Sequence, residues 1–265
     1  MERIVSADNA LLKSVRRLGT SARERNRTGK LLLDGVHLVQ AYAQRHGCAH
    51  ATIVVSESGL SNPEIATAAV NSGAARVVCV ADSLFARISP VQTPSGILTV
   101  VDRPQLEESG DEAFWVVLDG LQDPGNLGSI LRTAAASGAT CAVLAADCAD
   151  PWSPKALRGG MGAQLTLPLQ EHASLGAVLK SFHGRVIGMV PRGGPTIFEV
   201  ELRGPIALVF GSEGHGLRPD TAAGIQLQAS IPASGAVESL NVAAAAAVCC
   251  FERVRQRSAG GDSPP

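Results

Sequence analysis

Three segments of the sequence combine glycines with polar side chains in a way that could hold a small ligand. They are LDGLQDPGNLGSILR at 118–132, LVFGSEGHGL at 208–217 and IPASGAVESLNV at 231–242. Glycine lets the main chain approach a ligand closely or adopt positive φ, so backbone N–H and C=O groups here could bind the edge of an adenine. Ile231 and Leu240 could supply apolar walls. Together the segments favour one composite pocket for a nucleotide-like ligand.

The same segments carry polar side chains that could serve a reaction. Asn126 and Arg132 fall less than two turns apart on an expected helix, so both could face one site. Glu213 lies among glycines, and Ser239 and Asn241 come just before an apolar run. Simpler interpretations exist for four of them: a surface arginine for Arg132, an ordinary charge near a helix N-terminus for Glu213, and polar helix caps for Ser239 and Asn241.

Two common nucleotide-binding motifs are missing from the sequence. No G-x-G-x-x-G follows the apolar segment at 114–119, which argues against a Rossmann oxidoreductase. A phosphate loop of the form G-x-x-x-x-G-K-[ST] is also absent. The glycine-rich segments therefore point to a different kind of nucleotide site.

An alternating pattern of strands and helices positions these segments. Apolar runs rich in β-branched residues predict strands at 51–56, 75–80, 96–101, 114–120, 140–146, 185–190 and 205–211. Helices are expected between them, including 7–18, opened by Ser6 or Asp8, and 126–139. This alternation is typical of an α/β fold with a mostly parallel sheet, whose ligands bind at the carboxyl ends of the strands. The charged segment 102–112 is expected to link two such series.

Composition favours a cytosolic protein. The 265 residues are 45% hydrophobic and 3% aromatic, so a large core must be built from Ala, Val, Leu and Ile. No apolar run reaches the roughly 18 residues that cross a bilayer, and the N-terminus lacks the apolar segment of a secretory signal. The six cysteines show no C-x-x-C spacing, which favours reduced, buried thiols over a zinc site. We therefore expect neither a membrane nor a metal among its partners.

Charge is unevenly distributed along the chain. Residues 1–45 hold nine Lys/Arg against four Asp/Glu, a net of +5, whereas the whole chain has a net charge of −1. A basic segment on an otherwise acidic protein favours a polyanionic partner, although the same residues could form a solvated helix face.

The spacing of the polar segments resembles the SpoU family of RNA ribose 2′-O-methyltransferases. N-x-G-x-x-x-R at 126–132, G-x-E-x-x-G at 211–216, and I-P at 231–232 followed by S-L-N-V at 239–242 match its three motifs in order and approximate spacing. PKALRGGMGA at 154–163 is also similar to the family, which often has Ser at the position of Gly160. Residues 1–100 look like the family's N-terminal substrate-binding domain, related to ribosomal proteins, with Asp34-Gly35 where the family commonly has Glu-Gly.

The resemblance implies a fold in two parts. Residues 1–101 would form a smaller α/β RNA-binding domain, and residues 112–256 would form a SPOUT methyltransferase domain with a mostly parallel sheet and a deep trefoil knot. Residues 257–265 are expected to be a disordered tail. Family members of this kind are homodimers that bind S-adenosylmethionine in the knotted loops, so a homodimer is expected here.

The resemblance also implies roles for individual residues. The family's cofactor contacts fall on Gly211, Ile231 and Leu240. Its catalytic arginine falls on Arg132, and beside it stand Asn126, Glu213, Ser239 and Asn241. The basic segment would bind RNA phosphates through Arg16, Arg17, Arg23, Arg25 and Arg27.

The N-terminal domain favours ribosomal RNA, because the family's tRNA enzymes generally lack such a domain. Two alternatives remain open at this point. One is a tRNA 2′-O-methyltransferase, and the other is a non-catalytic RNA-binding protein on the same fold. The presence of Asn126, Arg132, Glu213 and Asn241 argues against the non-catalytic alternative.

Overall fold

The computed structural model describes residues 1–108, 113–234 and 238–259. They form two compact units: Met1–Gln105 with Asp150–Leu165, and Leu106–Ala149 with the chain from Thr166 onward. The two sheets fall on either side of the expected linker at 102–112, of which 109–112 lies outside the described residues. The packing of residues 150–165 with the first unit was not anticipated from the sequence.

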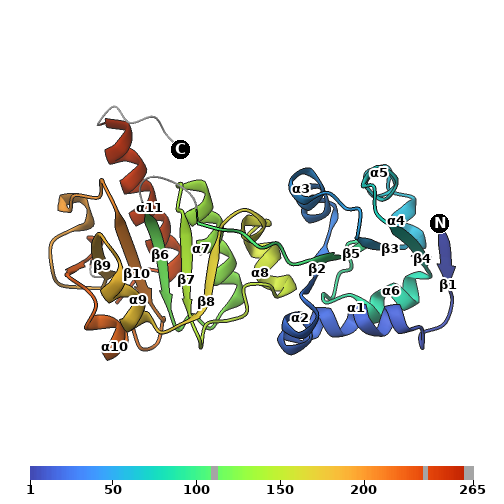
Figure 1. The fold of residues 1–265 in the computed structure, drawn as a ribbon, viewed down its shortest axis with the longest axis horizontal. Helices are drawn as coiled ribbons and strands as arrows, with labels where there is room; N and C mark the ends of the chain where they lie inside the picture. Colours follow the sequence, from blue (N-terminus) through green and yellow to red (C-terminus); the bar gives the residue numbers. More distant parts are fainter. Residues whose placement is uncertain (109–112, 235–237, 260–265) are drawn as a thin grey trace. The chain divides into compact units, whose positions relative to one another are not determined.

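The first unit contains a five-stranded mixed sheet with the order β1-β4-β3-β5-β2 (Figure 1). β1 (Glu2–Ile4), β4 (Arg76–Val80) and β3 (Thr52–Ser56) run parallel. β5 (Ile97–Asp102) is antiparallel to both β3 and β2 (Lys30–Asp34). The central strands β3 and β5 are almost wholly buried, as their β-branched runs require.

Helices pack on this sheet through the apolar faces that the sequence indicates. The first begins at Ala10, where Asn9 rather than Ser6 or Asp8 accepts a hydrogen bond from the N–H of Leu11 at 2.9 Å. Its buried residues, Leu12, Val15 and Leu18, belong to the expected apolar face. The helices of this unit are α1 (Ala10–Thr20), α2 (Ala22–Thr28), α3 (Val36–His46), α4 (Glu57–Leu60), α5 (Pro63–Asn71), α6 (Asp82–Ile88), α8 (Pro154–Gly159) and the short 3₁₀ helix η1 (Ala163–Leu165).

The second unit contains a six-stranded sheet in which every pairing is parallel, with the order β11-β9-β10-β6-β7-β8. This confirms the expected α/β class. The two edge strands, β8 and β11, were not predicted from the sequence. The strands are β6 (Phe114–Asp119), β7 (Cys141–Ala145), β8 (Leu169–Ala173), β9 (Arg185–Met189), β10 (Ile206–Gly211) and β11 (Leu227–Ala229).

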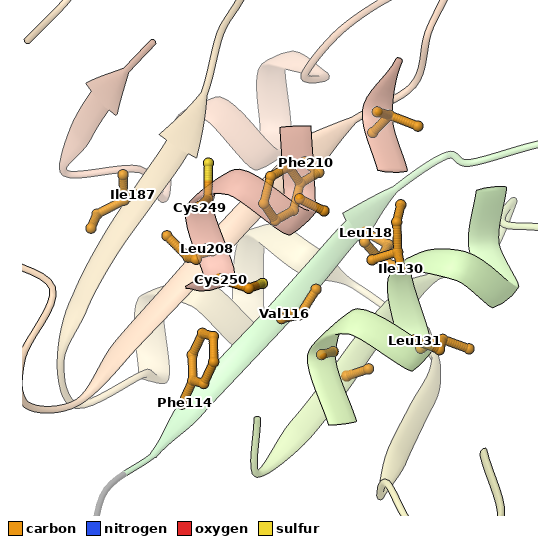
Figure 2. Packing of buried hydrophobic residues seen from close by; sticks show 14 of the residues in the cluster. Phe114, Val116, Leu118, Ile130, Leu131, Ile187, Leu208, Phe210, Cys249 and Cys250 are labelled. Atoms are coloured by element: carbon orange, nitrogen blue, oxygen red, sulfur yellow. The ribbon is translucent and has the colours of Figure 1, made fainter. Parts of the chain in front are cut away.

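Two long helices of the second unit, α7 (Pro124–Ala136) and α11 (Val242–Ala259), pack against each other over one face of its sheet (Figure 1). Figure 2 shows side chains of β6 and β10 directed into this core, toward α7 and α11. The alanine-rich run of α11 leaves room for that close packing. The remaining helices are α9 (Leu175–Ser181), α10 (Pro219–Ala222) and the 3₁₀ helix η2 (Ile197–Glu199).

The closing helix is longer than the sequence pattern suggested. α11 continues to Ala259, three residues into the segment expected to be a disordered tail, and residues 260–265 lie outside the described structure. Arg253 lies buried on this helix, with its guanidinium over the ring of Phe114 at 4.8 Å. In the described part of the chain, no helix has the length and apolar character needed to cross a membrane.

Candidate active site

The parallel sheet of the second unit brings the polar segments to one edge. β11, β9, β10 and β6 are consecutive neighbours, so the loops that follow them all leave the sheet at its carboxyl edge. The described residues that follow these four strands are 230–234 with 238–241, 190–196, 212–218 and 120–123. The convergence that the sequence predicted for three glycine-rich segments therefore follows directly from strand order.

A chain of hydrogen bonds joins three of the predicted catalytic residues. The side-chain oxygen of Asn241 accepts from the N–H groups of Ala243 and Ala244, at 2.9 and 3.2 Å, and so caps α11. The Asn241 amide group donates to the side-chain oxygen of Asn126 at 3.2 Å. The Asn126 amide group in turn donates to the carboxylate of Glu213 at 2.6 Å. Asn241 can therefore cap α11 with its side-chain oxygen and at the same time bind Asn126 with its amide nitrogen.

The direction of this chain is fixed from one end to the other. Because the oxygen of Asn241 is held by helix N–H groups, its amide nitrogen must face Asn126. The oxygen of Asn126 is then used, so its nitrogen must face Glu213. The carboxylate of Glu213 is the last acceptor of the chain. Its donor is the amide group of Asn126, which is oriented by the hydrogen bond from Asn241.

The start of α7 positions the backbone of Asn126. Asp123 is the N-cap and accepts from the N–H of Asn126 at 2.8 Å, and Pro124 occupies the first turn, where a missing N–H costs nothing. Asn126 is therefore clamped by its main chain while its side chain carries the hydrogen bonds to Glu213 and Asn241. Asp123 was not among the site residues that the sequence suggested.

Two predicted catalytic residues lie outside the chain of hydrogen bonds. Arg132 is exposed on α7, and its side chain makes no hydrogen bond or ion pair with any other residue that the structure describes. Arg132 lies six positions after Asn126, which turns it about 120° around the helix axis. Ser239 is exposed on the loop before α11. The structure thus brings Asn126, Glu213 and Asn241 together and leaves Arg132 available to a substrate.

The loop that carries Glu213 is a tight turn that depends on glycine. Ser212 and Gly216 pair with each other through N–H···O bonds of 3.1 and 2.9 Å. A Cβ on Gly211 would lie 2.2 Å from the carbonyl carbon of Gly216, and Gly216 itself has φ +66°. Since no other side chain fits at Gly211, the turn explains the glycines and places Glu213 near its tip.

A pocket of about 820 Å³ opens beside this loop. Its walls include all three residues that the family resemblance linked to the cofactor, Gly211, Ile231 and Leu240. Glu213 and Asn241 line the same pocket, as does Ser239. The volume is in the range of small-molecule sites, and the mixture of apolar walls and exposed main chain suits a nucleoside with polar substituents.

Asp119, at the end of β6, contacts Arg218 and so fixes the end of the loop 212–218 that carries Glu213. Its buried carboxylate accepts from the N–H of Arg218 at 2.8 Å and pairs with the Arg218 guanidinium. Arg218 also reaches Asp147 at 3.2 Å. These contacts, chiefly the hydrogen bond with Asp119, raise the pKa of Arg218. The sequence signal that could have identified this contact is an acidic residue, Asp119, at the end of an apolar strand.

We expect Asp119→Asn to weaken cofactor binding about tenfold and to lower the free energy of unfolding by about 1–3 kcal/mol, because a buried charge-assisted contact is lost. The side chain of Arg218 is 44% exposed, so the stability loss belongs to the lower part of that range. Cofactor titration and denaturant unfolding measure the two effects. Asp220→Asn, an exposed acid two residues beyond Arg218, is the matched control. Unchanged affinity in Asp119→Asn would contradict a positioning role.

Burial controls the protonation of two cysteine thiols. Burial raises the pKa of Cys141 and of Cys250 to about 12 each, so these thiols stay protonated near neutral pH. Among the described residues, no group of three or more His, Cys, Asp or Glu side chains could hold a metal ion.

The arginines expected to contact RNA differ in their environments. Arg16, Arg17 and Arg23 are exposed on α1 and α2. Arg27 is exposed too, but Glu24 binds its guanidinium through two hydrogen bonds. Arg25 requires a correction. It is only 4% exposed and is bound to Asp150 and to the carbonyl of Leu18, so it has a structural role within the first unit.

Asp34 also has a structural role. The side chain is buried and accepts hydrogen bonds from the hydroxyl of Ser95 and from Arg158 on α8. Gly35 follows it with φ +103°, a conformation that only glycine adopts readily. The contact of Asp34 with Arg158 thus links the end of β2 to the segment 150–165 of the same unit.

Comparison with known proteins decides the family. The SpoU rRNA methylase family matches residues 113–251, more than half of the chain. The chain belongs to this family. The MRM3-like substrate binding domain matches residues 9–99, so the SpoU domain is preceded by a domain of a substrate-binding type.

Individual relatives of the SpoU family cover nearly all of the chain. An uncharacterized tRNA/rRNA methyltransferase of Synechocystis is 37% identical over 96% of this chain and 94% of its own length. RlmB of Pseudomonas putida, a 23S rRNA (guanosine-2′-O-)-methyltransferase, is 32% identical over 84% of this chain and 95% of its own. The SpoU methyltransferase AviRb of Streptomyces viridochromogenes, solved with the cofactor AdoMet, superimposes with a TM-score of 0.83 at 27% identity, covering 94% and 98% of the two chains.

Proposed function

We propose that the protein is an S-adenosylmethionine-dependent methyltransferase that modifies a ribose 2′-hydroxyl of ribosomal RNA. The observation that carries the proposal is the hydrogen-bond chain Asn241–Asn126–Glu213, whose two end residues line a pocket of nucleotide size, within the region matched by the SpoU family. RlmB of Pseudomonas putida, which matches 84% of this chain, is named a 23S rRNA (guanosine-2′-O-)-methyltransferase, and the AviRb structure contains the cofactor.

The residues of the pocket fit the cofactor. Gly211 exposes main chain at the end of β10, and Ile231 and Leu240 provide apolar surface for an adenine ring. When bound there, S-adenosylmethionine supplies a methyl group on an electron-poor sulfonium. Holding this group and the ribose in line would provide much of the rate, because alignment converts a bimolecular step into an intramolecular one.

Arg132 is proposed to act on the substrate hydroxyl as a cation. A guanidinium stays protonated in proteins, so it stabilises the negative charge that develops on O2′ more readily than it removes the proton. Its freedom from partners among the described residues supports this role. Asn126 links Glu213 to Asn241 through hydrogen bonds, so that the polar groups of Glu213 and Asn241 on the pocket wall are preorganised.

Isothermal titration of the full-length protein tests the cofactor assignment. We expect S-adenosylmethionine to bind with one site per chain and NAD to show no binding. Binding of NAD in place of S-adenosylmethionine would move the protein to a different class of nucleotide-binding enzyme.

The first unit is proposed to bind RNA, and its exposed arginines are the expected phosphate contacts. We predict that replacing Arg16, Arg17 and Arg23 with Gln weakens binding to a ribosomal RNA fragment and lowers the slope of log K against log salt by about 2 to 3, one per lost contact. Fluorescence anisotropy at several salt concentrations measures the slope. Arg45→Gln, an exposed arginine on α3, is the control. An unchanged slope in the triple variant would remove these residues from the interface.

The oligomeric state is part of the same proposal. We predict a homodimer, on the basis of the family resemblance and of Phe251, which is 49% exposed at the end of the apolar run of α11. Light scattering at micromolar concentration should give twice the chain mass, and a monomer mass would contradict the prediction. A deep trefoil knot and a cytoplasmic location also remain predictions, the second supported by six free cysteines.

A further inference from the structure

The loop that follows β9 is fixed on both sides of its tip. The N–H of Val190 donates to the carbonyl of Ala229 at 2.9 Å, and the N–H of Ser230 donates to the carbonyl of Pro195 at 3.1 Å. A Cβ on Gly194 would lie 2.1 Å from the carbonyl oxygen of Gln228, so the loop is pressed directly onto β11. The tip between these anchors carries Arg192.

Arg192 lines the pocket already described and has no partner among the residues that the structure describes. Among the described residues on the pocket wall, it is the only lysine or arginine. No hydrogen bond or ion pair joins its exposed guanidinium to another described residue. The other charged side chains of that wall are the acids Glu213 and Glu238. The pocket thus offers one cationic group and two anionic ones.

This arrangement complements the charges of S-adenosylmethionine, which carries an ammonium, a sulfonium and one carboxylate. The two cationic groups suit a wall that contains Glu213 and Glu238. The carboxylate would be repelled by those acids and needs a positive partner, and guanidinium binds carboxylates through two parallel hydrogen bonds. We propose that Arg192 binds the carboxylate of the methionine part of the cofactor and is the residue that selects ligands with an intact amino-acid end. This inference rests on the proposed function.

Two ligands separate the amino-acid end from the rest of the cofactor. S-adenosylhomocysteine keeps the carboxylate and the ammonium, whereas 5′-methylthioadenosine lacks both. Titration calorimetry with the full-length protein should show that Arg192→Gln weakens S-adenosylhomocysteine about ten- to a hundredfold, the usual effect of losing a hydrogen bond between charged groups. The affinity for 5′-methylthioadenosine should stay the same, which also shows that the variant is folded.

Two further variants sharpen the comparison. Arg192→Lys keeps the charge without the planar fork and should give an intermediate loss. Arg203→Gln removes an exposed arginine of the same unit that lies outside this pocket, and it should bind both ligands like the unchanged protein. Equal affinity of Arg192→Gln and the unchanged protein for S-adenosylhomocysteine would overturn the inference.

An RNA phosphate is the other anion that an arginine at a pocket mouth could bind. Anisotropy with a ribosomal RNA fragment distinguishes it. Loss of RNA affinity in Arg192→Gln with unchanged S-adenosylhomocysteine affinity would assign Arg192 to the substrate and overturn the inference, while leaving the proposed function intact. Failure of the unchanged protein to bind S-adenosylhomocysteine would overturn the proposed function, and this inference with it.

Discussion

Replacing Arg132 with Lys should lower methyl transfer by on the order of a hundredfold while leaving the affinity for S-adenosylmethionine nearly unchanged. Lysine keeps the positive charge but loses the planar fork and part of the reach of arginine. Arg132 lies on α7, outside the set of residues that line the cofactor pocket, so its effects on binding and on transfer should separate. Single-turnover transfer and cofactor titration on one preparation measure both quantities.

Ser129→Ala provides the control for Arg132→Lys, because Ser129 is an exposed residue one turn earlier on the same helix. It should leave both quantities unchanged. Near-normal transfer by Arg132→Lys and Arg132→Ala would remove Arg132 from the catalytic residues. A loss of cofactor affinity equal to the loss of transfer would instead make it a binding or structural residue.

Asn126→Asp should reduce transfer at least as strongly, because it reverses the middle of a directional hydrogen-bond chain. The amide group that donates to Glu213 at 2.6 Å would become a carboxylate beside another carboxylate. The remaining donor, from Asn241, supports only one side of the new residue. We expect a loss of about a hundredfold or more in transfer, together with weaker cofactor binding, since Glu213 lines the pocket.

The double exchange of Asn126→Asp with Glu213→Gln tests what the chain is for. The new amide at position 213 would donate to the new carboxylate at position 126, while Asn241 still donates from the other side. Every hydrogen bond can therefore re-form, with the negative charge moved from position 213 to position 126. Recovery of cofactor affinity without recovery of transfer would show that charge at Glu213 is needed. Recovery of both would reduce the chain to a structural support, and recovery of neither would mean that the two residues are not coupled as the distances indicate.

The location of the site could be predicted from the sequence because it depends on local chemistry. Asparagine, glycine and glutamate at fixed spacings follow buried β-branched strands, and parallel strands bring such loops to one edge. The close contact of Gly211 with Gly216 shows why this loop tolerates no side chain at that position. The confirmed α/β class has the same origin, in the alternation of apolar strands with amphipathic helices.

Contacts between residues that are far apart in the chain could not be predicted from the sequence. The ion pair of Asp119 with Arg218 joins residues 99 positions apart, and Arg25 finds Asp150 at a separation of 125. A count of basic residues cannot distinguish buried Arg25 from its exposed neighbours, because burial depends on what the fold places beside it. The edge strands β8 and β11 are partly exposed, so they lack the apolar run that identifies a central strand.

The direct test of the proposed function is the chemical position of the transferred methyl group. The protein is incubated with labelled S-adenosylmethionine and with unmodified ribosomal RNA or tRNA, and the digested nucleosides are analysed by mass spectrometry. We predict label in a 2′-O-methylated nucleoside of ribosomal RNA, at a linkage resistant to alkaline cleavage because its 2′-hydroxyl is blocked. Label on a base, label only in tRNA, or no transfer from a protein that binds the cofactor would contradict the assignment.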